Sequence, residues 1–404
     1  MATEYFKEDI YMKNIKKIIC LFIAAVMVLS VLPFSAFAGN DKLCFHEDGT
    51  FKVLMINDTQ DNEKLNSNTV EFLTKACQRE KPDLVCIAGD ILSDIWPFAS
   101  EEKLEKNFNE MCSLLESLGV HFAITMGNHD HDRCDECSSV AHMMAVATKY
   151  KNHVDTSDCC DPATYSIPIY SHDASTVKYV IYMMDSNNKG EALSMSGYTG
   201  LYPEQIEWYK ATAEKYKEAN GGVYVPSTVI QHVPVAEIYD FLKEIPMANY
   251  IDTDSVFSSN DYKWYKLNNE DYPDMTGSLG EAPCSELVST GEYTAWTQTG
   301  VVSAFFAHDH VNSFAATTKD GIYMGYNGGT GFNSYGFGDK RSCRVIRLDE
   351  NNLKKIDTNL IYFKDVVGKN MAFYPTDILS PVIITKLMQT LCLIPSLFCK
   401  LFGI

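Results

Sequence analysis

The sequence contains no internal repeat, no low-complexity segment and comparatively little positive charge. Lys and Arg number 34 against 53 Asp and Glu, which gives a formal net charge of -19. This deficit argues against a nucleic-acid-binding protein, which needs basic surface to displace counterions from phosphates. Apolar residues make up 46% of the chain, so global disorder is also excluded. Chemistry on an anionic group would need local positive charge, and a bound metal ion is the obvious source.

Residues 1–38 are predicted to be a signal peptide. A basic stretch with three lysines precedes an apolar run over 18–31, and Ala36 and Ala38 provide a small-x-small cleavage pattern. An uncleaved anchor helix is the alternative. We therefore expect an exported protein that is extracellular or associated with the cell envelope.

Seven of the 13 cysteines fall into two groups that matter for an exported protein. Three lie within apolar helix or strand patterns and are predicted to be core residues: Cys77, Cys86 and Cys112. Four lie in polar loops: Cys134, Cys137, Cys159 and Cys160. We expect one or two disulfides among these four, and a structural four-thiolate zinc site is the alternative.

Five short apolar runs each end in polar residues that can bind a metal ion. The runs span 51–57, 84–88, 122–126, 228–231 and 301–307. They are followed by Asp58, by Gly89-Asp90, by Gly127-Asn128-His129-Asp130, by His232 and by His308-Asp309-His310. Runs this short and apolar are typical of strands buried on both faces.

Helical patterns over 66–80, 101–118 and 203–220 separate these runs. The alternation of strand and helix predicts an α/β fold with a mainly parallel sheet. Strands are also predicted over 344–349 and 359–364. Ligands of such sheets collect at the carboxyl ends of the strands, so we expect the polar residues there to lie together.

Two further segments have a different character. Residues 240–299 form a polar, Tyr-rich stretch that we interpret as an insertion or lid, with a plain solvated loop as the alternative. Residues 376–404 carry apolar residues at helical spacing together with two lysines, which argue against a membrane span. This tail is predicted to be an amphipathic helix in peripheral contact with a membrane, or else a helix packed on the domain over 39–375.

The mixture of carboxylates, an amide and imidazoles suits manganese, iron or zinc. Asp90, directly after a glycine, is the natural bridge between two metals, which about 3.5–4 Å apart can clamp the entering and leaving oxygens of a phosphoryl transfer. His129 is better placed as a general acid or phosphate donor than as a ligand, with Asp130 orienting its ring.

In this order, Asp58-x-Gln60, Gly89-Asp90, Gly127-Asn128-His129-Asp130, His232 and His308-Asp309-His310 resemble the motifs of the calcineurin-like metallophosphoesterases. The resemblance covers about residues 51–347 and is greatest to the small purple-acid-phosphatase-like branch. It implies a four-layer α/β/β/α sandwich with its metal site at the carboxyl ends of the strands.

The resemblance also implies roles for single residues. One metal would be held by Asp58, Asp90 and His310, and the other by Asp90, Asn128, His232 and His308. His129 would be the catalytic histidine. Gln60 stands where the family usually has a histidine, and its amide oxygen could bind the first metal or hold a water. The two ions would be divalent or trivalent Mn, Fe or Zn.

The sequence therefore predicts a secreted dinuclear-metal phosphoesterase that hydrolyses phosphate esters with metal-activated water. Monoesters are the first choice of substrate and phosphodiesters the second. A catalytically weak, envelope-associated binding protein on the same fold is the alternative, suggested by Gln60 and the Tyr-rich insertion. We expect no nucleic-acid partner, and the oligomeric state stays open.

Overall fold

The computed structural model describes residues 42–62, 64–93, 100–132, 139–188, 198–246, 254–286 and 288–381. The predicted signal peptide, Cys134, Cys137 and most of the predicted tail lie outside the described residues. Within those ranges, no helix combines the length and the apolar character that a membrane crossing requires.

The first of two large sheets has five strands in the order β15-β14-β1-β2-β3. Its strands are β1 (Thr50–Ile56), β2 (Leu84–Ala88), β3 (His121–Thr125), β14 (Ser342–Asp349) and β15 (Asp357–Tyr362). β1, β2 and β3 run parallel, whereas β14 is antiparallel to both β1 and β15. The carboxyl ends of the three parallel strands therefore meet at one edge.

The second sheet has seven strands in the order β12-β13-β11-β7-β6-β5-β4. They are β4 (Cys159–Asp161), β5 (Thr164–Tyr170), β6 (Val177–Met184), β7 (Ser227–Gln231), β11 (Val301–Phe306), β12 (Ala315–Thr317) and β13 (Tyr323–Tyr326). β6, β7, β11 and β13 are parallel neighbours.

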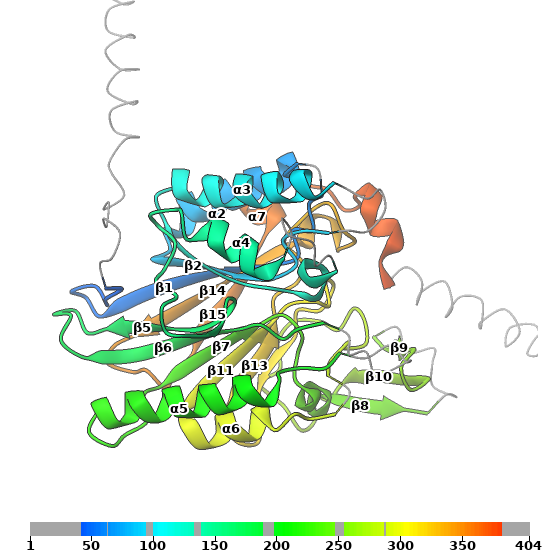
Figure 1. Ribbon diagram of the computed structural model, residues 1–404. Coiled ribbons are helices and arrows are strands. Elements are labelled where there is room, and N and C mark those ends of the chain that lie inside the picture. Colours follow the sequence, from blue (N-terminus) through cyan, green and yellow to red (C-terminus); the bar gives the residue numbers. More distant parts are fainter. Residues whose placement is uncertain are drawn as a thin grey trace, which may run out of the picture. The chain divides into compact units, whose positions relative to one another are not determined.

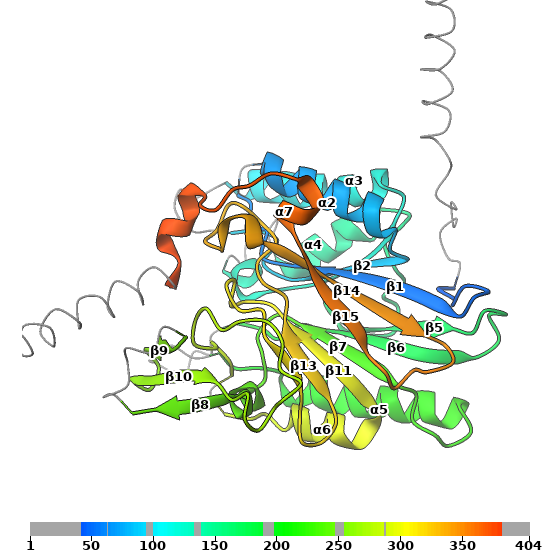
Figure 2. The same ribbon diagram turned by 180° about the vertical axis from the view of Figure 1, so that it is seen from behind.

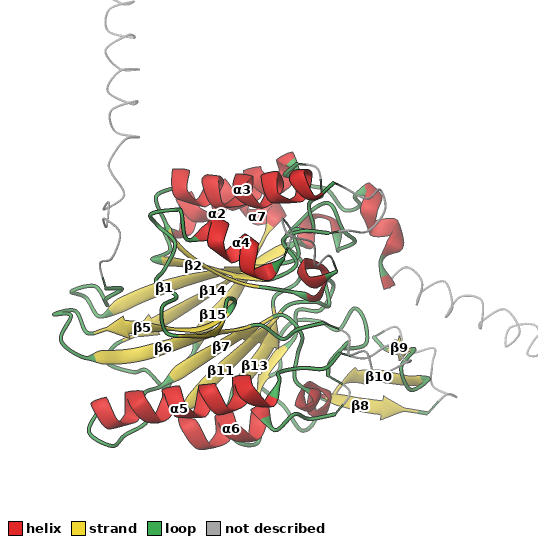
Figure 3. Ribbon diagram, viewed as in Figure 1, coloured by secondary structure: helices red, strands yellow, loops and turns green. Residues whose placement is uncertain are grey.

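Helices cover the outer faces of the two stacked sheets, which gives four layers (Figures 1 and 3). The five-stranded sheet is covered by α2 (Ser67–Glu80), α3 (Glu101–Ser117), α4 (Val140–Ala147) and α7 (Phe363–Val367), and the other by α5 (Pro203–Ala219) and α6 (Glu292–Thr299). The predicted α/β/β/α fold is thus confirmed.

Strand β6 shows why these runs are apolar throughout. Tyr179, Ile181 and Met183 belong to the core that includes the five-stranded sheet, whereas Val180, Tyr182 and Met184 belong to the core beneath α5. Successive side chains of a strand point to opposite faces. A strand between two buried faces therefore needs apolar residues at every position.

The predicted helices and the five predicted strand runs match observed elements to within a few residues. Helix α2 begins after Asn66, whose side chain accepts a hydrogen bond from the Asn68 backbone. Strands β4, β5, β6, β12 and β13 and helices α4 and α7 were not predicted, and the strand predicted over 359–364 ends at Tyr362, where α7 follows. The stretch over 240–299 holds β8 (Leu242–Ile245), β9 (Val256–Ser258) and β10 (Lys263–Leu267), which form a small separate sheet (Figure 2), and also helix α6. Its role as a lid stays a prediction.

Cys77, Cys86 and Cys112 are buried, as predicted. Cys159 and Cys160 carry free thiols, so neither takes part in the disulfides expected among the four polar-loop cysteines, of which Cys134 and Cys137 lie outside the described residues. The two residues are neighbours on strand β4, where adjacent side chains point to opposite faces. The Cys160 thiol instead contacts the carbonyl oxygen of Glu204 at 3.8 Å.

A buried ion pair ties the start of the predicted tail to the domain. Arg341 is 1% exposed, and its guanidinium donates to Asp377 at 2.8 Å and to the carbonyl oxygen of Ser334 at 2.7 Å. Asp377 is itself 4% exposed. The boundary predicted between residues 375 and 376 therefore cuts through a contact of the folded domain.

Candidate metal centre

The carboxyl ends of four strands bring the predicted metal ligands together. Asp58 follows β1, Asp90 follows β2, His232 follows β7, and His308 and His310 follow β11. The turns are linked to each other, because the backbone N–H of Asp58 donates to Gly89 at 3.1 Å and that of Ala307 donates to His232 at 3.0 Å. The site is therefore built across both sheets.

Two groups of donor atoms share the carboxylate of Asp90. One group contains Asp58, Asp90 and His310, and the other contains Asp90, His232 and His308, with the donor atoms of each group within 4.8 Å of one another. His232 Nε2 lies 3.2 Å from Asp90 Oδ2, and His310 Nε2 lies 3.2 Å from Asp58 Oδ1. Asp90 thus occupies the position that a bridging ligand would need.

Unsatisfied oxygens show that this donor set fits metal ions. Asp58 Oδ1 and Asn128 Oδ1 are both buried. Among the described residues, Asn128 Oδ1 has no hydrogen-bond partner, and Asp58 Oδ1 meets only the imidazole nitrogens of His310 and His232, at 3.2 and 3.8 Å. A buried oxygen without a partner costs free energy unless something else binds it. Two carboxylates, an amide oxygen and three imidazoles are together a suitable donor set for Mn, Fe or Zn.

Backbone contacts fix the orientation of two imidazoles. His232 Nδ1 lies 2.7 Å from the carbonyl oxygen of Ala88, and His310 Nδ1 lies 2.9 Å from that of Tyr335. The Tyr335 ring also stacks on His310, with ring centroids 4.2 Å apart. A carbonyl holds the proton on Nδ1, which leaves Nε2 of both rings as a donor to a metal.

The backbone of the site is strained. Four non-glycine residues have positive φ: Asp58 (51°), Gln60 (46°), Asp90 (50°) and His308 (73°). Such conformations are uncommon outside glycine and cluster at functional sites. Gly127 has a different role, because a Cβ there would lie 2.2 Å from Asp90 Oδ1 and 2.5 Å from the Asp90 backbone nitrogen. Only glycine lets the two turns approach this closely.

The carboxylates create a strongly negative local field. Burial lowers the pKa of His232, but Asp90 and Asp58 outweigh burial and raise it to about 10. The pKa of His310 is raised to about 9 by Asp58 against the same burial effect. The field that draws protons to these rings is also the field that would attract cations.

Gln60 lies within the site and contacts Asp90 through its amide nitrogen. The side chain is 4% exposed, and its amide nitrogen donates to Asp90 Oδ2 at 2.9 Å. The amide thus contacts the same carboxylate that both donor groups share. Whether Gln60 binds a metal stays a prediction.

The predicted partner of His129 is wrong. His129 Nδ1 lies 2.5 Å from Asp132, not from Asp130. Asp130 instead accepts hydrogen bonds from the backbone nitrogens of Gly127, Leu92 and Ile91 at 2.9, 3.0 and 3.1 Å. Burial and the neighbouring Asp90 raise the pKa of Asp130 to about 7 in spite of these bonds. Because residues 128–131 form a 3₁₀ turn, positions three apart share a face, and this brings Asp132 to His129.

His129 itself is placed beside the two donor groups. Its backbone nitrogen donates to Asp90 Oδ1 at 2.8 Å, and its side chain is 24% exposed. Burial lowers the pKa of His129, but Asp90 and Asp132 together raise it above its ordinary value. The ring is therefore within reach of solvent and is held on its Nδ1 side.

Sequence reasoning missed Asp185, which is 3% exposed and lies 2.9 Å from His131 Nε2. It follows strand β6 in the same way that His232 follows β7. The run Val177–Met184 is as apolar as the five that were recognised, so the same signal could have found it.

Several known proteins are similar to this chain. The family model of the calcineurin-like phosphoesterases matches residues 51–312. Two similar proteins from Arabidopsis thaliana are named probable inactive purple acid phosphatase 28 and probable inactive purple acid phosphatase 14, and each is 24% identical to this chain. The first match covers 80% of this chain and 86% of the relative, and the second covers 84% of this chain and 91% of the relative. A dimetal phosphatase from Danio rerio is 11% identical with a TM-score of 0.44, and the match covers 78% of this chain and 99% of that one. Because the family model matches well over half of it, this chain belongs to the calcineurin-like phosphoesterase family.

Proposed function

We propose that this chain is an exported, active phosphoesterase that hydrolyses phosphate monoesters at a dinuclear metal centre. In the reaction, the oxygen of a water molecule forms a new bond to phosphorus and the ester P–O bond breaks. The water loses a proton and the departing alcohol oxygen gains one, so the products are inorganic phosphate and an alcohol. Two bound metal ions would polarise the phosphoryl oxygens and acidify the attacking water.

The observation that carries this proposal is the pair of donor groups that share Asp90, together with buried oxygens on Asp58 and Asn128 that accept no regular hydrogen bond from the described residues. A purely structural cluster would satisfy these oxygens with hydrogen bonds. Asp58, Asp90 and His310 would hold one ion. Asp90, Asn128, His232 and His308 would hold the other.

His129 would supply the proton to the leaving oxygen. Asp132 holds Nδ1 of the ring, which leaves Nε2 to face the substrate. An aspartate that holds one imidazole nitrogen fixes the tautomer and stabilises the protonated ring. Asp132 is therefore a positioning residue in this proposal, and Asp130 keeps the turn that carries both residues in place.

The test is hydrolysis of phenyl phosphate by the full-length chain, titrated with manganese, iron and zinc. We expect metal-dependent turnover that is lost in Asp90→Asn, with bound metal lost in parallel. Asp158→Asn is the matched control, because Asp158 forms a surface pair with Lys215 at 2.9 Å and belongs to neither donor group. Folded, metal-loaded protein that does not cleave the monoester would refute the proposal, and turnover of a diester alone would identify a phosphodiesterase instead.

A catalytically weak binding protein is a second candidate, favoured by one observation. The donor group of Asp58, Asp90 and His310 contains a single imidazole. The Gln60 amide donates to Asp90 Oδ2, so it competes with a metal ion for that carboxylate. Under this alternative, Gln60→His should raise both metal affinity and turnover from a very low level. If Gln60→His instead leaves an already active wild type unchanged, the alternative is rejected.

Export is proposed on the basis of the sequence of residues 1–38. The test is secretion of the full-length chain and determination of its mature N-terminus, which we expect at Gly39. Peripheral membrane contact through 376–404 would be tested by co-sedimentation with liposomes. A truncation after Pro381 is the informative variant, because Asp377 belongs to the folded domain.

A further inference from the structure

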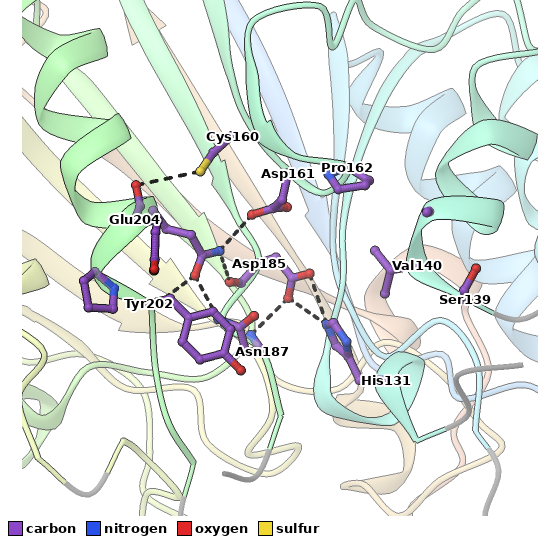
Figure 4. Close-up of a pocket in the computed structure, with 13 residues that line it drawn as sticks. His131, Ser139, Val140, Cys160, Asp161, Pro162, Asp185, Asn187, Tyr202 and Glu204 are labelled. Carbon is purple, nitrogen blue, oxygen red and sulfur yellow. Dashed lines mark hydrogen bonds and ion pairs between the residues drawn. The ribbon is translucent and has the colours of Figure 1, made fainter. Parts of the chain in front are cut away.

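A pocket of about 750 Å³ opens among five segments of the chain (Figure 4). Its lining comes from the 3₁₀ turn that carries His129, the start of α4, the turn between β4 and β5, the end of β6 and the start of α5. This volume lies within the range of sites for small organic ligands. It is much larger than a phosphate group needs.

The register of the sheet places this pocket beside the metal centre. Met184 of β6 pairs with Gln231 of β7, so the next residues, Asp185 and His232, are neighbours on adjacent parallel strands. Adjacent strands lie about 4.8 Å apart. Asp185 lines the pocket, whereas His232 belongs to one of the metal-binding groups.

The turn with the catalytic histidine forms a second connection. His131 lines the pocket and contacts Asp185 at 2.9 Å (Figure 4). His129 lies two residues earlier, about 4 Å along a 3₁₀ axis. Asn188 also reaches from the end of β6 to Asp132, the residue that holds His129, at 3.5 Å. The pocket thus adjoins the turn that carries His129.

The lining combines apolar walls with hydrogen-bond acceptors. Its apolar surface comes from Val140, Ala141, Pro162, Pro203 and the Tyr202 ring. Three carboxylates line the same pocket: Asp161, Asp185 and Glu204. The described lining residues include no Lys or Arg. A ligand that carries hydrogen-bond donors would therefore be favoured, and one that carries negative charge would be repelled.

The start of α5 does not reverse this preference. A helix N-terminus can bind an anion through its free N–H groups. Here the side chain of Gln205 accepts a hydrogen bond from the Tyr202 backbone at 2.8 Å, and Glu204 adds negative charge to the first turn. At α4, Ser139 accepts from the His142 backbone at 3.2 Å. Ser139 thus caps α4, and the charge of Glu204 opposes anion binding at the start of α5.

We propose that this pocket binds the alcohol part of the phosphate ester and selects uncharged or cationic alcohols that bear hydroxyl or amino donors. The inference rests on the proposed function and specifies its substrate class. The phosphoryl group would lie at the metal centre, and the alcohol would extend past His131 against the Tyr202 ring. Esters of acidic alcohols would be poor substrates.

The first test concerns the size of the alcohol. We compare kcat/KM for a hexose 6-phosphate with that for methyl phosphate, whose alcohol is too small to fill the pocket. Ala141→Trp, which fills the pocket, should lower this ratio at least tenfold. Ala145→Trp is the matched control, because Ala145 is also exposed on α4 but lies outside the lining, and it should leave the ratio unchanged.

The second test concerns charge and does not depend on packing. The ratio of kcat/KM for O-phosphoethanolamine to that for 3-phosphoglycerate should fall at least threefold in Glu204→Lys. Glu207→Lys, one turn further along α5 and outside the lining, should leave it unchanged. If the wild type hydrolyses these esters but neither ratio changes in the pocket variants, this inference is wrong and the proposed function stands. If metal-loaded wild type hydrolyses none of these esters, both this inference and the proposed function are refuted.

Discussion

The ion pair between Arg341 and Asp377 permits a quantitative prediction about the end of the folded domain. Both residues are almost fully buried, and their charged atoms are 2.8 Å apart. Removing one partner of a buried pair leaves an uncompensated charge and typically costs about 3–5 kcal/mol. The guanidinium also packs 4.6 Å from the Phe332 ring centroid, so it cannot turn towards water without losing that contact. Asp377→Asn should therefore lower the free energy of unfolding by about 3 kcal/mol or more.

The assay is urea denaturation followed by circular dichroism. The midpoint should shift to lower urea with an unchanged slope, which identifies a change in stability alone. The surface substitution Asp158→Asn should cost at most about 1 kcal/mol. Truncation after Pro375 should match Asp377→Asn, whereas truncation after Pro381 should have little effect. A cost for Asp377→Asn as small as that of the surface control would refute the reasoning.

Three further predictions address the turn at the site and the opposite end of β3. Gly127→Ala should abolish metal binding, because the added Cβ would lie 2.2 Å from Asp90 Oδ1. The metal content of the purified protein measures this, and Gly221→Ala, where open space surrounds the glycine, should retain the metal. Asp132→Asn should lower kcat about tenfold at constant metal content, because it removes the anion that holds His129; an unchanged kcat would exclude the positioning role. Burial lowers the pKa of His153 from 6.5 to about 4, so the folded state binds fewer protons than the unfolded state between these values. The contribution of neutral His153 to the free energy of unfolding should be complete above pH 6.5 and should fall by at most about 3 kcal/mol towards pH 4. Urea titrations of His153→Phe should not show this fall.

Much of the fold could be predicted from the sequence because strands buried on both faces require unbroken apolar runs. The runs before Asp58, Asp90 and His232 are strands, and the polar residue that ends each run lies in the site. Edge strands give a weaker signal. Strand β4 has three residues and β5 contains Pro168, so neither shows the pattern of a central parallel strand.

Details of the site depended on geometry that one sequence does not contain. Asp130 and Asp132 both lie near His129 in sequence, and only the 3₁₀ turn determines which of them contacts the ring. The pairing of Arg341 with Asp377 spans 36 residues, and no local pattern marks it. Such contacts follow from how segments pack, whereas strand ends follow from local hydrophobicity.

The distribution of charge unites the metal centre with the adjoining pocket. In a chain of net charge -19, a phosphate ester is repelled unless cations are already bound. Asp58 and Asp90 are the carboxylates of the two donor groups, so two divalent ions would leave about +2 at the site, which matches a phosphate monoester dianion. Asp161, Asp185 and Glu204 keep the adjoining pocket negative, so the two ends of a substrate meet opposite fields. Inorganic phosphate should therefore bind measurably only to metal-loaded protein in isothermal titration calorimetry, and equal affinity for the metal-free protein would contradict this account.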